Sequence, residues 1–142
     1  MFPLSHLHPM IVHFPIALIV IGFLAELASL FFRKDTCLPK ISLYLLITGT
    51  LAAVVTVLTG VFFTKEMSGE AGVVRSTHEL LAFVTLGLLV VTSVIRLIPF
   101  LGGKQSKSMN WLAFFFYLLG VISVSATGFL GGTLVYNYMM PL

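Results

Sequence analysis

Histidine is the residue type in this 142-residue chain whose side chain could do chemistry that packing alone does not explain. His6, His8 and His13 lie near the start of the chain, and His78 lies near its middle. Neutral imidazole is a common ligand of iron, copper and zinc. Two imidazoles held at equal depth on two helices of one bundle could bind the opposite faces of a haem. The elements that carry the histidines therefore decide whether such a site can form.

Those elements must be embedded in lipid. Hydrophobic residues make up 58% of the chain, charged residues only 9%, and the mean hydropathy is +1.09. A soluble domain has about a quarter of its residues charged, so the low charge of this chain excludes a soluble domain. Each apolar run exceeds the roughly 20 helical residues that cross a bilayer. We predict an all-α integral membrane four-helix bundle, running up-down-up-down as one domain over 1–142, with helices at about 9–32, 41–63, 74–101 and 109–138.

Lysine and arginine predict the orientation, because cytoplasmic segments of membrane proteins keep them in excess. Six lie on the side of the loops after the first and third helices, namely Arg33, Lys34, Lys40, Arg96, Lys104 and Lys107. Only Lys65 and Arg75 lie on the opposite side. This distribution predicts a protein of the bacterial inner membrane with both termini in the periplasm and all four histidines near the outer leaflet. Lipid is the expected surrounding, and no nucleic-acid partner is expected.

His13 and His78 are the best-matched pair in the sequence. If their helices begin at Pro9 and Val74, each imidazole lies about one turn inside the membrane. A weak internal repeat also relates them, because a glycine follows each histidine by nine positions, and it suggests two parallel helix-hairpin repeats. We predict them as the axial ligands of one haem b. His8 is a second candidate, but five residues place it about 140° around the helix from His13.

Four further residues are predicted to surround the haem. Gly60 and Gly128 would leave room for a flat macrocycle, or serve the ordinary close packing of membrane helices. Arg75 is a nearby cation for the propionates. Tyr136 would hydrogen-bond a propionate or belong to the interfacial aromatic belt. The sequence leaves these alternatives open.

The segment Leu7-His8-Pro9-Met10-Ile11-Val12-His13-Phe14-Pro15, together with His78 and the stretch Gly131 to Tyr136, resembles the DUF2231 family. The resemblance covers nearly the whole chain. It implies a small four-helix bacterial membrane protein, associated with cytochrome c modules and able to bind haem. Tyr138 occupies a position where similar chains have a histidine, which argues against a second haem.

The leading functional prediction is a membrane cytochrome that passes single electrons near the periplasmic face. It would be a subunit of a respiratory or photosynthetic assembly, with cytochrome c or a quinol as its redox partner, and not an enzyme. The alternative is a structural or assembly subunit without redox chemistry. A divalent metal site at His6, His8 and His13 is disfavoured, because their spacing does not gather them on one helical face.

Glu26 and Arg96 both lie one to two turns inside the expected cytoplasmic ends of the first and third helices, where a lone charge is costly. They could form an interhelical ion pair, or each could extend separately to the interface. The sequence does not distinguish these two arrangements.

Overall fold

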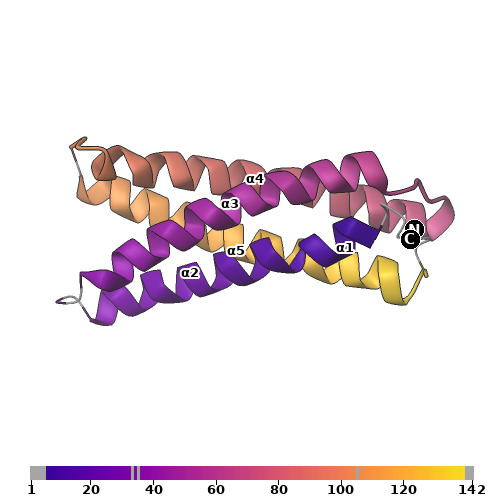
Figure 1. Cartoon of the computed structure of the whole chain (residues 1–142), viewed down its shortest axis with the longest axis horizontal. Coiled ribbons are helices and arrows are strands. Elements are labelled where there is room, and N and C mark those ends of the chain that lie inside the picture. Colours follow the sequence, from indigo (N-terminus) through magenta and orange to yellow (C-terminus); the bar gives the residue numbers. More distant parts are fainter. Residues whose placement is uncertain (1–5, 33, 35, 105, 140–142) are drawn as a thin grey trace.

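The computed structural model describes residues 6–32, 34, 36–104 and 106–139. Its helices are α1 (Leu7–Ile11), α2 (His13–Phe31), α3 (Cys37–Phe63), α4 (Gly69–Phe100) and α5 (Lys107–Tyr136). Within the described part of the chain, four spans are long and apolar enough to cross a membrane, with α1 and α2 forming the first. Figure 1 shows the long helices side by side and turning back at each end. The predicted all-helical membrane bundle is confirmed.

The helices extend beyond the apolar runs that predicted them. α3 begins at Cys37 and α4 at Gly69, several residues before the expected starts at 41 and 74. α5 also begins early, because the Ser106 side chain accepts a hydrogen bond from the Met109 amide at 3.1 Å and so caps the helix. His78 consequently lies nine residues inside α4, so the expected helix starts do not give the depths of the histidines.

The first span is interrupted at Val12, between α1 and α2. Pro15 follows three residues later and has no amide hydrogen to donate to the carbonyl of Ile11. A proline at this place breaks or kinks a helix. The break separates His8, in α1, from His13, the first residue of α2.

The two hairpins, α2–α3 and α4–α5, bury equivalent positions. The buried residues Pro15, Ile19, Gly22 and Phe23 of α2 each have a buried partner 70 positions later, namely Thr85, Leu89, Thr92 and Ser93 of α4. The same relation with an offset of 71 connects Ser42, Leu46, Gly49 and Ala53 of α3 with Ala113, Tyr117, Gly120 and Val124 of α5. The hairpins are therefore related by a pseudo-two-fold axis along the bundle. Ile19 and Leu89, both fully buried, lie in the common core.

This burial pattern corrects the register of the repeat. The sequence paired His13 with His78, whereas the offset of 70 makes His8 the equivalent of His78. In the second helices of the hairpins, Thr56 corresponds to Thr127 and Gly60 to Gly131. The glycine nine positions after a histidine was a chance match, because glycine recurs often in these apolar helices.

Glu26 and Arg96 form an ion pair between the two hairpins. Both side chains are largely buried, and the offset of 70 makes the two positions equivalent. The structure thus decides between the two arrangements that the sequence allowed. The outer surface is apolar, with large exposed side chains such as Ile21, Phe62 and Phe129, as lipid contact requires.

Candidate functional site

A cavity of about 230 Å³ lies at the end of the bundle that holds α1 and the last turns of α5, called here the histidine end. Residues of all five helices line it, and most are apolar. Many occur as equivalent pairs, including His8 and His78, so the cavity straddles the pseudo-two-fold axis. An apolar cavity with a few convergent polar groups is the usual form of a cofactor site.

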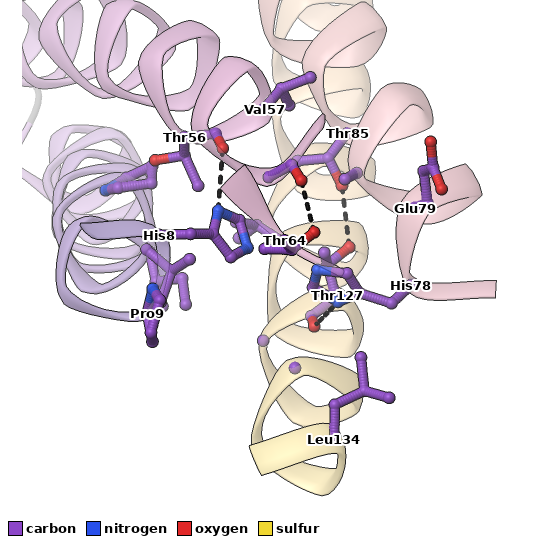
Figure 2. A pocket seen from close by; sticks show the side chains of 18 of the residues that line it. His8, Pro9, Thr56, Val57, Thr64, His78, Glu79, Thr85, Thr127 and Leu134 are labelled. Atoms are coloured by element: carbon purple, nitrogen blue, oxygen red, sulfur yellow. Dashed lines mark hydrogen bonds between the residues drawn. The ribbon is translucent and has the colours of Figure 1, made fainter. Parts of the chain in front are cut away.

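His8 and His78 face each other across this cavity. Figure 2 shows His8 entering from α1 and His78 from α4, on opposite sides. Their ring centroids are 6.2 Å apart and their planes meet at 86°. Both side chains are half-buried. The two residues that the repeat makes equivalent are therefore the two that meet.

Each ring is fixed by a hydrogen bond from Nδ1 to a backbone carbonyl. His8 Nδ1 lies 3.0 Å from the Thr56 carbonyl oxygen, and His78 Nδ1 lies 2.9 Å from that of Thr127. A carbonyl only accepts, so Nδ1 carries the hydrogen in both rings and Nε2 retains a lone pair. His8 Nδ1 also lies 3.3 Å from Oγ1 of Thr59. Both imidazoles are thus the tautomer that binds a metal through Nε2.

Two glycines allow the rings to lie directly against the neighbouring helices. A Cβ at Gly60 would lie 2.9 Å from Cε1 of His8, and one at Gly131 would lie 3.1 Å from Cε1 of His78. Any larger residue would displace an imidazole. The two histidines therefore share two kinds of contact, with a threonine carbonyl and with the glycine four residues after that threonine.

The other predicted site residues lie around this pair. His13 lines the edge of the cavity and is exposed, away from the centre where His8 lies. Gly128 lines the cavity and packs closely, because a Cβ there would lie 2.9 Å from Cδ1 of Ile16. Arg75 lines the cavity and forms an ion pair with Glu79 at 3.6 Å. Tyr136 lines its rim and is 83% exposed.

The sequence prediction missed Thr56 and Thr127, whose carbonyl oxygens lie within hydrogen-bond distance of the two rings. A signal for them exists, because a threonine precedes a glycine by four positions in both Thr56–Gly60 and Thr127–Gly131. This signal can be recognised only when the offset of 71 positions between α3 and α5 is known. His6 lies just before α1.

The donor set suits one kind of metal group. Among residues 6–32, 34, 36–104 and 106–139, no cluster of three or more His, Cys, Asp or Glu side chains could hold an ion alone. Two opposed imidazoles instead suit an iron whose other ligands come from a macrocycle.

Comparison with known protein families is consistent with the helical architecture. The family described as "Predicted membrane protein (DUF2231)" matches residues 5–141. The chain belongs to the DUF2231 family. No curated protein and no solved structure matches it. The family description supports a membrane protein and does not specify a cofactor or an activity.

Proposed function

We propose that this membrane protein is a b-type haem electron carrier whose iron is bound by His8 and His78. The observation that carries the proposal is the pair of imidazoles, 6.2 Å apart, each with Nδ1 hydrogen-bonded to a backbone carbonyl. The sequence favoured His13 in place of His8. The geometry favours His8, because His13 is exposed at the edge of the cavity.

A bound haem would supply reversible one-electron iron chemistry. The Thr56 and Thr127 carbonyls hold the proton on Nδ1 of each histidine and orient the rings, which also makes the imidazoles more basic ligands. Gly60 and Gly131 set how far each ring lies from its neighbouring helix. The apolar walls lower the local dielectric, which tunes a redox potential. The proposal requires no nucleophile or general base, so it describes a carrier and not an enzyme.

Other cavity residues would contact the haem, and other molecules would exchange electrons with it. Arg75 and Tyr136 line the cavity and are candidates to contact the propionates, and Gly128 belongs to its wall. One haem is proposed, because one opposed histidine pair is present among the described residues. We propose cytochrome c or a quinol as redox partner, and further membrane subunits as neighbours.

Absorption spectroscopy of the purified protein, expressed with adequate haem supply, tests the proposal. The reduced protein should show the sharp α-band of a low-spin b haem. His8→Ala and His78→Ala should each remove the band or convert the haem to high spin, because one axial ligand is lost. His13→Ala is the matched control and should keep the low-spin spectrum. Loss of the band in His13→Ala, with His8→Ala unchanged, would instead restore the ligand pair that the sequence favoured.

A specific observation also favours the alternative of a structural or assembly subunit. The same two hydrogen bonds tie α1 to α3 and α4 to α5, a scaffolding role that needs no cofactor. If the intact protein binds no haem, while both histidine variants unfold more readily, the structural role is the correct one and electron transfer is excluded.

The proposed location is the bacterial inner membrane, with the histidine end at the periplasmic face. A reporter fused after Leu142 should behave as periplasmic, and one inserted between Gly102 and Lys107 as cytoplasmic, because basic residues concentrate on the second side. The reverse pattern would place the histidines at the cytoplasmic face.

A further inference from the structure

The two halves of the cavity differ at several equivalent positions, and three of these differences share one feature. His13 of the first hairpin corresponds to Phe83 of the second. Gly128 and Gly132 of α5 correspond to Val57 and Val61 of α3. At each position one half has an imidazole or a glycine where the other has a larger apolar side chain. Differences between otherwise equivalent halves mark where the cavity departs from its symmetry.

All three differences lie on the same side, where α2 meets α5. Gly128 contacts Ile16, since a Cβ there would meet the Ile16 side chain. His13 lies one turn before Ile16 on α2, and Gly132 lies one turn after Gly128 on the antiparallel α5. Helical spacing therefore puts His13 and Gly132 at the same depth. Together with Ile16 and Gly128 they form what we call the α2–α5 notch.

The notch is open, polar at one point and uncharged. A Cβ built on Gly132 would meet nothing within 4 Å, and His13 is exposed. The charged residues that line the cavity, Arg75 and Glu79, are on α4. Glu79 precedes Phe83 by four residues and so shares its face, on the α3–α4 side. Among the described cavity-lining residues, the α2–α5 side thus offers a hydrogen-bonding imidazole between apolar walls and no formal charge.

We propose that the α2–α5 notch binds the ring of a quinone or quinol from the membrane, with His13 hydrogen-bonded to a ring oxygen. The ligand is neutral because the notch has no lysine, arginine, aspartate or glutamate. It is apolar because the other members of the notch, Ile16, Gly128 and Gly132, carry no polar side chain, and Gly132 leaves open space against its backbone. It carries a carbonyl or hydroxyl oxygen because a neutral imidazole donates one hydrogen bond and accepts another.

The inference deepens the proposed function, since a quinol is a membrane electron donor and the cavity joins the notch to the His8–His78 pair. Binding itself does not require haem. A phospholipid head group is disfavoured, because its phosphate would need a cation that the notch lacks.

The experiment measures the affinity of a short-chain benzoquinone analogue for the full chain in quinone-free phosphatidylcholine nanodiscs, with and without haem. His13→Phe and Gly132→Val introduce the residues of the equivalent positions on the α3–α4 side. Each should weaken binding about tenfold or more, through loss of a hydrogen bond and steric filling respectively. His13→Gln retains a donor and an acceptor and should restore most of the affinity.

The matched control is Phe83→Leu on the α3–α4 side, which should leave the affinity unchanged. Equal affinities in His13→Phe, Gly132→Val and Phe83→Leu would overturn the notch as the site, and so would absence of binding to the native chain. Quinone binding with the expected pattern in a protein without the low-spin α-band would uphold this inference while the haem proposal fails. A low-spin α-band in a native chain that binds no quinone would support the haem proposal and overturn the quinone site.

Discussion

The two ends of the bundle use equivalent positions of the two hairpins in different ways. At the histidine end the equivalent residues are identical, His8 and His78, and their rings meet with Nδ1 already engaged. At the other end they are oppositely charged, Glu26 and Arg96, and they form an ion pair, while Glu26 Oε2 has no hydrogen-bond partner among the described residues. Two identical imidazoles line one cavity, and under the proposed function they would hold a third group between them, whereas two opposite charges bind each other directly. The comparison contrasts a pair built around a cavity with a pair built as a direct contact.

Breaking the ion pair should give the largest effect on stability. Glu26→Leu or Arg96→Leu alone leaves a buried charge without a partner and should lower the free energy of unfolding by about 3–5 kcal/mol. The double variant replaces both charges with apolar groups and should cost far less than the sum. Denaturation in mixed detergent measures all three. Additive losses would show that the two charges act separately.

Substitution of the glycines should affect the histidine end and leave the other end intact. Gly60→Ala and Gly131→Ala place a methyl group against the His8 and His78 rings, so each should weaken haem binding about 10–100-fold if the rings are ligands. Haem titration followed at the Soret band measures this. Gly87→Ala is the matched control, because a Cβ there would meet nothing within 4 Å. Unchanged haem affinity in both ring-contact variants would separate the rings from haem binding.

The smallest expected effect lies between the two ends, where Thr50 Oγ1 and Ser93 Oγ are 3.0 Å apart and link α3 to α4. Thr50→Val, Ser93→Ala and the double variant should give a coupling energy of about 0.6 kcal/mol, as is typical of hydrogen bonds between membrane helices. Thr48→Val is the control, because Thr48 is exposed and bonds only carbonyls of its own helix. A coupling of several kcal/mol would make this bond, and not the charges, the main polar link.

The fold was predictable because lipid imposes strong constraints on composition. Four long apolar runs with few charges allow little besides four spanning helices. Hydropathy does not give the rotation of each helix, so the sequence could not tell whether Glu26 meets Arg96. It also could not choose between His8 and His13, because the break at Val12 and the true repeat register become evident only from the packing. The signal in Thr56–Gly60 and Thr127–Gly131 was present, but the weaker glycine match obscured it.

Each of the two pairs, Glu26–Arg96 and His8–His78, has one member in each hairpin, and this division has a consequence for biosynthesis. The first hairpin leaves the ribosome with Glu26 and His8, and the second supplies Arg96 and His78. An isolated first hairpin therefore holds the Glu26 carboxyl group in lipid without its partner, and only one of the two facing histidines. Under the proposed function, haem loading would follow insertion of the second hairpin, so a chain truncated before α4 should bind no haem and should be a target for membrane proteolysis.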